Sequence, residues 1–108
     1  MKKTNFHKPA KINMIDFKEI IFCKAESNYT RIYYQDKNCL SSKVLKHLES
    51  ELPSKLFIRT HRSYLVNVSF VTDFKNNSVV LKSDIEIPVA RSKKSELLDA
   101  LSKNKLLL

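Results

Sequence analysis

Glycine is absent from this sequence of 108 residues. Phosphate-binding loops of the Walker and dinucleotide types need glycine where the backbone approaches the phosphates, so both nucleotide-binding classes are excluded. The Gly-x-Ser-x-Gly elbow of serine hydrolases is excluded with them. His61 beside Ser63 does not replace it, because adjacent residues rarely converge as base and nucleophile. We therefore expect no enzyme and no small-molecule substrate.

Cysteine is scarce, and Cys23 and Cys39 are the two copies. Their spacing is not the C-x-x-C of zinc sites, and two thiols do not make a disulfide scaffold. Both lie in apolar, strand-like surroundings, which favours buried side chains. His47 and His61 stand at no spacing that would make them ligands together with the cysteines. We expect no metal and no cofactor.

Long apolar segments are missing as well. No run approaches the roughly 18 apolar residues that mark a membrane-spanning helix. The N-terminal residues Met1-Lys2-Lys3 are not followed by the apolar core of a signal peptide. The sequence predicts a cytoplasmic protein that has no membrane partner.

Positive charge is what the sequence has in excess. It contains 20 Lys and Arg residues against 11 Asp and Glu, which gives a formal net charge of +9 and a pI near 9.7. Such a balance favours a polyanionic partner, either nucleic acid or an anionic membrane surface. The hydrophobic fraction of 43% is that of an ordinary globular chain. The length suits one domain with its own core.

The hydrophobic pattern predicts a mostly β domain with about seven or eight short strands. Ile85, Ile87 and Val89 alternate with polar neighbours in the clearest period-two pattern of the chain. Pro88 lacks a donor for the ladder, which indicates an edge strand. The candidate strand segments are 10–15, 20–25, 29–35, 39–40, 57–58, 65–66, 68–74, 78–82 and 85–89, and the expected turns are 26–28, 36–38, 75–77 and 83–84.

Two modest helices are predicted besides a single helical turn or tight connection at residues 16–19. Each has apolar residues at helical spacing and a serine near its start that can cap it. The first has its stripe and its end at Val44, Leu45, Leu48, Leu52 and Pro53, with Ser41 or Ser42 as the cap. The second opens at residues 91–94, with Ser92 as the cap and a stripe of Leu97, Leu98 and Leu101.

The same reading divides the chain into three parts. Residues 1–9 carry three lysines and end at Pro9, which suggests a loose basic arm. Residues 10–102 hold the predicted strands and helices. Residues 103–108 end in Leu106-Leu107-Leu108 and are expected to be a frayed or partner-seeking tail.

Polar and basic residues gather at the ends of three predicted strands. Each cluster alone is explained by a solvated surface, but their joint occurrence with the net positive charge favours nucleic-acid binding. Arg suits bidentate contact with guanine, Asn and Ser can bond bases or phosphate, and Lys neutralises phosphate. The candidate binding residues are Asn28, Tyr29, Thr30 and Arg31, then Arg59, His61, Arg62 and Ser63, and finally Arg91, Ser92, Lys93 and Lys94.

Four segments of the chain resemble the LytTR family of bacterial DNA-binding domains. Residues 57–67 (FIRTHRSYLVN) are similar to the family signature, and residues 16–29 (DFKEIIFCKAESNY) to its early Ile-rich strand and polar turn. Leu45 and Leu48 match its helix, and residues 87–91 (IPVAR) its last strand and terminal arginine. Together they cover roughly residues 10–102 in the right order.

The resemblance implies a mostly β, LytTR-like fold of small packed antiparallel sheets with one or two short helices. It implies that loops enter successive major grooves of double-stranded DNA, with pairs of the domain, as a homodimer, on direct-repeat sites. The domain would be the output part of a response regulator in a two-component system. Thr30 and its neighbours would lie at the DNA, Arg62 and Arg91 would read bases, and Arg59, Lys93 and Lys94 would anchor phosphates.

The sequence departs from the family in two ways. The turns at 36–38 and 83–84 lack the glycine that members often have. A receiver domain is missing, so we expect either an excised output domain or a stand-alone regulator. One alternative is a protein-interaction module that pairs with or titrates a full-length regulator, using the apolar tail. Another is an RNA or single-strand binder that stacks bases on Tyr29 and Tyr33.

Overall fold

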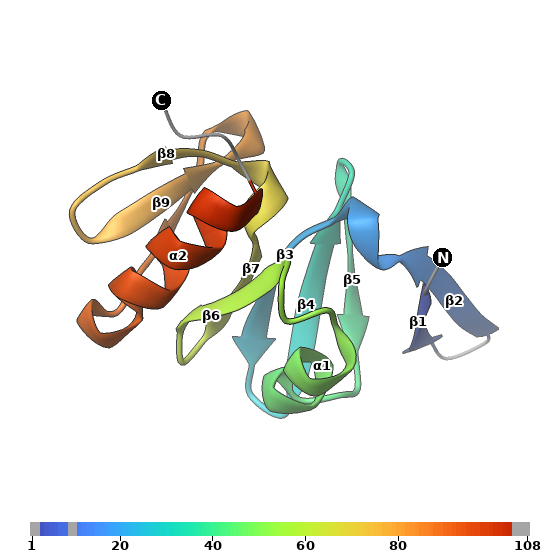
Figure 1. Cartoon of the computed structure of the whole chain (residues 1–108). Coiled ribbons are helices and arrows are strands. Elements are labelled where there is room, and N and C mark those ends of the chain that lie inside the picture. The colour runs from blue at the N-terminus through green and yellow to red at the C-terminus, as the bar shows by residue number, and fades with distance from the viewer. Residues whose placement is uncertain (1–2, 9–10, 105–108) are drawn as a thin grey trace.

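The computed structural model describes the backbone of residues 3–8 and 11–104, and the side chains of residues 15–104. Within these residues the fold is mostly β, as expected, with three antiparallel sheets and two α-helices (Figure 1). The described residues form ten strands, more than the seven or eight that the sequence pattern predicted. Four 3₁₀ turns, η1 to η4, lie between elements of the described chain, and one of them, η2, interrupts the strand expected over 68–74.

A five-stranded antiparallel sheet forms the centre of the fold, with the strand order β5-β4-β3-β7-β6. The β4–β5 turn lies at Gln35 and Asp36, one residue earlier than predicted, and Gln35 has the positive φ of 53°. Lys37 and Asn38, predicted in this turn, already belong to β5. The strands are β3 (Ile20–Glu26), β4 (Tyr29–Tyr34), β5 (Lys37–Ser41), β6 (Phe57–His61) and β7 (Tyr64–Asn67).

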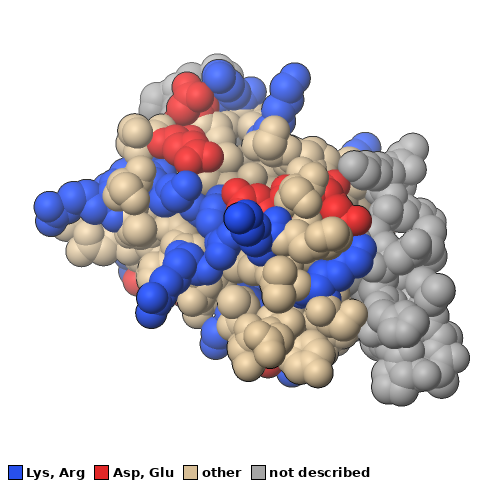
Figure 2. Space-filling model, turned by 90° about the horizontal axis from the view of Figure 1, so that it is seen from below, with Lys and Arg blue, Asp and Glu red and all other residues tan. Residues whose placement is uncertain are grey.

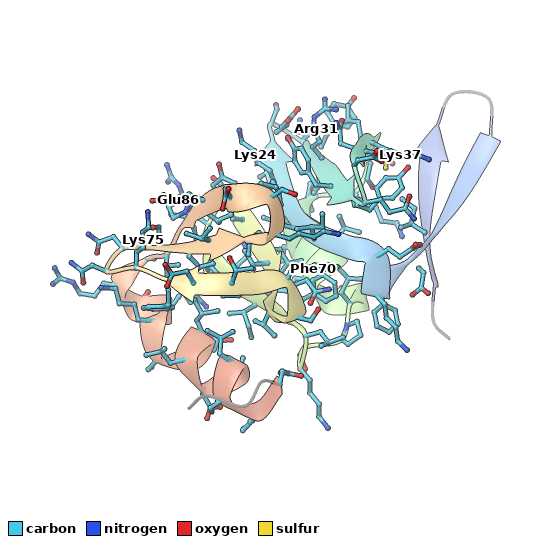
Figure 3. The ribbon with its side chains drawn as sticks, turned by 90° about the horizontal axis from the view of Figure 1, so that it is seen from above. Lys24, Arg31, Lys37, Phe70, Lys75 and Glu86 are labelled. Carbon is cyan, nitrogen blue, oxygen red and sulfur yellow. The ribbon has the colours of Figure 1, made fainter. Side chains whose placement is uncertain are left out.

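A three-stranded sheet packs beside it, with the order β10-β9-β8. Pro88 lies in β10 at the edge of this sheet, as its missing N–H predicted. The turn expected at 83–84 is present as η3 (Lys82–Asp84), and both Ser83 and Asp84 adopt positive φ without glycine. Lys75 and Glu86 pair at 3.2 Å between the β8–β9 turn and β10 (Figure 3). The strands are β8 (Val71–Phe74), β9 (Ser78–Leu81) and β10 (Ile85–Pro88).

The third sheet is a hairpin of β1 (Lys3–Lys8) and β2 (Lys11–Asp16) near the N-terminus. Residues 3–8, expected as a loose arm, instead form a strand that pairs with β2. Their polar sequence gave no sign of this pairing. Residues 1–2 and 9–10 lie outside the described residues. η1 (Phe17–Glu19) follows β2 as the single turn predicted there, with the Asp16 side chain accepting from the Lys18 amide.

Both predicted helices exist, but neither has the predicted cap. α1 (Leu45–Glu51) has Val44 at its N-cap and no side-chain bond there. Ser41 is buried in β5, where its hydroxyl accepts from the Lys43 amide. Ser92 lies inside η4 (Arg91–Lys93), which runs directly into α2 (Lys94–Asn104), so it cannot cap either. Residues 105–108, and with them the apolar tail, lie outside the described residues.

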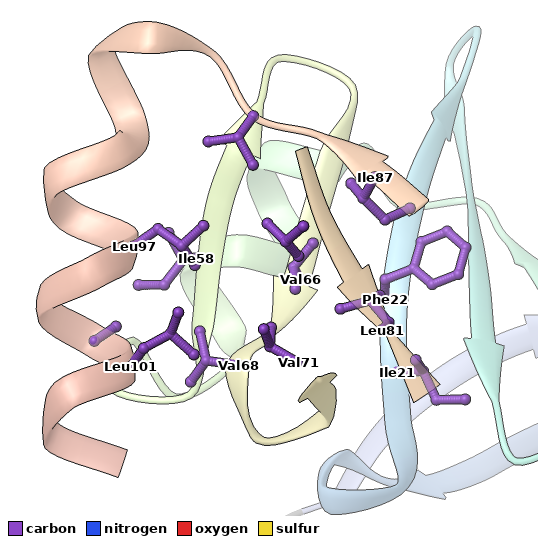
Figure 4. Packing of buried hydrophobic residues seen from close by; sticks show 13 residues of the cluster. Ile21, Phe22, Ile58, Val66, Val68, Val71, Leu81, Ile87, Leu97 and Leu101 are labelled. Carbon is purple, nitrogen blue, oxygen red and sulfur yellow. The ribbon is translucent and has the colours of Figure 1, made fainter. Parts of the chain in front are cut away.

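The central sheet is covered on both faces. On one face Ile32, Cys23 and Leu65 pack against Leu45 and Leu48 of α1. The other face meets the three-stranded sheet and α2, and Figure 4 shows Leu97 and Leu101 pointing toward Ile58 and Val68. The stripe of α2 is thus correct except for Leu98, which is exposed, and that of α1 except for Val44.

Both cysteines are buried, as predicted. Cys23 on β3 and Cys39 on β5 both pair with Ile32 of the intervening β4, so two strand spacings separate them. That is about 9–10 Å between Cα atoms, beyond the reach of a disulfide. Burial raises the pKa of the Cys23 thiol well above its usual range. The thiol therefore stays protonated and unreactive.

Asn67 joins the start of β3 to the turn that follows β7. Its side chain is fully buried, and its amide donates to the Ile20 carbonyl at 2.9 Å, where β3 begins. Its oxygen accepts from the backbone and hydroxyl of Ser69 at 2.9 and 2.7 Å and so caps η2 (Val68–Phe70). This cap breaks the strand that was predicted over 68–74 and turns the chain from β7 into β8.

The substitution Asn67→Ala would leave the buried Ile20 carbonyl and the Ser69 amide without partners. We expect it to lower the free energy of unfolding by about 1–3 kcal/mol, measured by urea denaturation. Asn77→Ala is the control, since Asn77 is an exposed residue of the β8–β9 turn, and it should change stability by less than about 0.5 kcal/mol. Equal effects of both substitutions would contradict this role of Asn67.

Candidate nucleic-acid interface

Three segments that carry the predicted binding residues lie at one end of the molecule. They are the β3–β4 turn at residues 27–28, the β6–β7 turn at residues 62–63, and η4 with the start of α2. Figure 1 shows all of them along the lower edge, while the β4–β5 turn lies at the opposite end of the sheet. The strand directions produce this arrangement, because each hairpin turn at this edge follows a strand running the same way.

Two backbone hydrogen bonds tie these segments together. The Ala25 amide donates to the Ser63 carbonyl at 2.9 Å, which joins the end of β3 to the β6–β7 turn. The Ala90 amide donates to the Thr60 carbonyl at 2.7 Å, which joins β6 to the residue before Arg91. The second bond coincides with an irregularity in the β6–β7 ladder, where Arg59 pairs with Leu65 but His61 pairs with Tyr64. A bulge of this kind re-aims the side chains around it.

Arg62 and Arg91 are the two arginines of the interface whose side chains stay free. Both are exposed, and within residues 15–104 neither guanidinium has a hydrogen bond or ion pair. Each lies in a short connection held by one of the two backbone bonds. Their donors are therefore available to an external acceptor while the backbone beneath them is fixed.

Arg59 is bound within the protein instead. Its Nε donates to the His61 carbonyl at 3.2 Å, and its second terminal nitrogen donates to the Arg62 carbonyl. The remaining nitrogen forms an ion pair with Glu49 of α1 at 3.0 Å. The Arg59 side chain keeps only 21% of its surface exposed.

Arg31 is likewise paired. It forms a two-point ion pair with Glu26 at 2.8 and 3.2 Å and donates to Asn38 at 2.8 Å. The Arg31 guanidinium lowers the pKa of the Glu26 carboxyl, and Glu26 in turn raises the pKa of Arg31. Figure 3 shows Arg31 and Lys24 projecting to the same side of the central sheet. Arg31 therefore offers little unpaired charge to an external anion.

Thr30 does not reach the surface. Its side chain is fully buried and its hydroxyl has no partner within the described residues. The neighbouring Asn28 and Tyr29 are exposed, with Tyr29 at 49%. The exposed side chains here are thus those of the turn and of Tyr29, the first residue of β4, while the next residue of the strand points inward.

His61 and Ser63 are half-buried beside Arg62. The Ser63 amide donates to Nδ1 of His61 at 3.1 Å, so the neutral ring carries its proton on Nε2. The His61 ring also packs edge-on against Tyr64, with 5.9 Å between the ring centroids. These contacts fix the imidazole while leaving one donor for another group.

The lysines at the start of α2 are less constrained. Lys94 donates to Asn76 of the β8–β9 turn at 3.3 Å, a neutral partner that leaves its charge in place. Lys93 forms a longer ion pair with Glu96 at 3.5 Å. Figure 2, which views this end of the molecule, shows Lys and Arg side chains across its left and central parts, with Asp and Glu toward the upper part.

Sequence reasoning missed the groups that organise this surface. Glu26 and Glu49 neutralise Arg31 and Arg59, and the backbones of Ala25 and Ala90 supply the connecting bonds. Glu26 lies five residues before its partner across a turn, a signal that could have been read. Glu49 is ten residues from Arg59 on another element, so only the packed structure reveals that pair.

Two further negative findings concern the part of the chain that is described. It contains no helix long and apolar enough to cross a membrane. It also contains no group of three or more His, Cys, Asp or Glu residues arranged to hold a metal ion.

Known proteins resemble this chain in sequence and in fold. The sequence model of the LytTr DNA-binding domain matches residues 10–102. The structure superimposes on a LytTr DNA-binding domain from Bacillus cereus with a TM-score of 0.78 at 20% identity, covering 94% of this chain and 97% of that one.

Relatives in sequence include whole regulators. The chain is 35% identical over 99 residues to the sensory transduction protein LytT of Oceanobacillus iheyensis, covering 84% of this chain and 40% of that protein. It is 30% identical over 105 residues to the heme-containing CO-sensing transcriptional regulator RcoM 2 of Paraburkholderia xenovorans, covering 92% and 39%. The chain thus spans about two fifths of these relatives. The family match covers most of its length, and the chain belongs to the LytTR family of DNA-binding domains.

Proposed function

We propose that this domain binds specific sequences of double-stranded DNA and regulates transcription, with its turns inserted in successive major grooves. The observation that carries the proposal is that Arg62 and Arg91 are exposed and have no side-chain partner within residues 15–104. The backbone bond from the Ala90 amide to the Thr60 carbonyl joins the residue before Arg91 to β6, the strand that leads to Arg62. A free guanidinium on a fixed backbone suits bidentate contact with guanine. Such contacts supply sequence preference, which charge alone does not.

The other exposed or half-exposed residues of this end are proposed as supporting contacts. Lys94 and Lys93 are proposed to neutralise phosphates, because among the described side chains Lys94 contacts the neutral Asn76 and Lys93 pairs at 3.5 Å with the exposed Glu96. The side chains of Asn28, Tyr29 and Ser92 are exposed and can form hydrogen bonds with the DNA backbone or with bases. We leave Thr30 out of the contact set because its side chain is fully buried.

At the level of the whole protein, we propose that the domain acts as the DNA-binding part of a bacterial regulator in the cytoplasm. The relatives include sensory transduction proteins and transcriptional regulators, which supports such a role. Pairs of the domain on direct-repeat sites, as a homodimer on DNA, remain part of the proposal. The turns at one end of the molecule leave the rest of its surface for contact with a neighbouring copy.

Selection of bound sites from a random double-stranded pool at about 150 mM salt tests the proposal directly, since non-specific electrostatic binding is much reduced there. We expect enrichment of a short motif, repeated in one direction. Binding without enrichment that fades smoothly with salt would contradict sequence reading. A module that acts through a protein partner would then fit better, and preferential competition by single strands would instead favour a single-strand binder.

Two substitutions separate base reading from phosphate contact on the selected site. Arg91→Ala should cost about 1–3 kcal/mol on that duplex and little on random duplex. Lys94→Ala should weaken both duplexes alike and reduce the salt slope by about 1. Lys37→Ala, on an exposed residue at the opposite end of the sheet, is the control and should change neither. Equal loss on both duplexes for Arg91→Ala would remove Arg91 from the base-reading set.

A further inference from the structure

Arg59 makes contacts that differ in kind from those of the other arginines at this end of the molecule. We infer that Arg59 is a positioning residue that sets the shape of the β6–β7 turn for Arg62, and not an anchor for DNA phosphate. The inference rests on the proposed function, in which Arg62 contacts a base. It assigns to Arg59 a part in sequence preference without contact to DNA.

The first argument is geometric. The planar guanidinium presents its donors in a fixed fork, and here the fork faces two consecutive carbonyls, those of His61 and Arg62. These carbonyls flank the backbone that carries the Arg62 side chain. Holding both fixes the orientation of the peptide between them, so the direction in which Arg62 leaves the turn depends on Arg59.

The second argument is the irregularity of the strand at this point. Between Arg59 and His61 the register with β7 shifts, so within the described residues Thr60 has no partner of its own across the ladder, and its carbonyl instead accepts from the Ala90 amide. A turn next to such a bulge lacks part of the regular ladder that would otherwise define it. The hydrogen bonds from the Arg59 side chain to the turn take the place of the missing ladder bonds and hold the backbone of the turn.

The third argument is electrostatic. Glu49 of α1 pairs with Arg59 at 3.0 Å, so the charge that a phosphate would attract is already balanced. The Arg59 side chain is only 21% exposed, whereas Arg62 is exposed and unpaired within residues 15–104. To bind a phosphate, Arg59 would have to give up contacts that hold the turn. Its ion pair also ties the turn to α1, which packs on the central sheet.

The test measures binding of the full chain to the selected duplex and to random duplex, with the variants Arg59→Lys, Arg59→Gln, Arg62→Ala and the double variant Arg59→Gln/Arg62→Ala. Lysine keeps the charge but cannot reach both carbonyls and Glu49 together. Glutamine removes the charge. The two carbonyls belong to a turn at the surface, where water can replace the lost donors, so both variants are expected to fold. Thermal unfolding checks this.

A positioning residue predicts that Arg59→Lys and Arg59→Gln each lose at least about fivefold on the selected duplex, the low end of one base contact. Random-duplex affinity and the salt slope should stay unchanged for both. The double variant should bind within about twofold of Arg62→Ala, because both changes remove one contact. In nitrogen-15 spectra, the amides of residues 61–63 should shift in both single variants.

A phosphate anchor predicts the reverse, and that result would overturn the inference. Arg59→Lys would keep both affinities, while Arg59→Gln would weaken both duplexes alike, with a salt slope smaller by about 1. Additive losses in the double variant would also contradict it. Failure of the proposed function looks different: the unsubstituted chain would then show no preference for any duplex, or Arg62→Ala would leave that preference intact.

Discussion

The arrangement of the interface depends on the bulge in β6 at Thr60. Where the β6–β7 ladder loses its register, the Thr60 carbonyl turns to the Ala90 amide, which brings the connection before α2 against the central sheet. On the other side of the same hairpin, the Ser63 carbonyl accepts from Ala25 at the end of β3. Segments about 30 to 40 residues away in sequence, one before the hairpin and one after it, are thus fixed to it and lie at the same end of the molecule.

The rigidity of this end comes from the packing behind it. The central sheet is buried on one face by α1 and on the other by the three-stranded sheet and α2, so its strands cannot shift independently. Asn67 fixes the opposite end of β7 to β3. Turns held on such a scaffold present side chains without a large loss of conformational entropy on binding. Glu26 and Glu49 pair with Arg31 and Arg59, whereas Arg62 and Arg91 have no side-chain partner within residues 15–104.

Much of the fold could be predicted from residue patterns. Period-two alternation identified β10 and its edge position from Pro88, and helical spacing identified the buried faces of both helices through Leu48 and Leu97. Local sequence signals predicted the helix N-caps less reliably. Serine is a favoured N-cap residue, so Ser41 and Ser92 were reasonable candidates. In the structure Ser41 belongs to β5 and Ser92 lies inside the 3₁₀ turn η4, so neither is at a helix N-cap. The strand β1 was missed, because residues 3–8 are polar and carry no clear strand pattern, whereas its partner β2 was expected over 10–15.

The candidate interface was predictable as a set of clusters but not in its internal chemistry. Charge and strand ends, together with the resemblance to the LytTR family, pointed to three segments that the structure places at one end of the molecule. The pairing of Arg59 with Glu49 and the burial of Thr30 depend on how strands and α1 pack, which no local pattern encodes. A count of positive residues therefore overstated the free charge, since Arg31 and Arg59 are neutralised within the fold.

The central claim is that the β3–β4 turn, the β6–β7 turn and the start of α2 form one surface that meets DNA together. The most direct measurement is a titration of the nitrogen-15-labelled chain with a duplex carrying the selected site, followed by amide chemical shifts. The account predicts the largest shifts at residues 26–29, 61–64 and 91–94, saturating at the same duplex concentration. Shifts centred on the opposite end, at residues 35–37 and 54–56, or confined to one of the three segments, would contradict it.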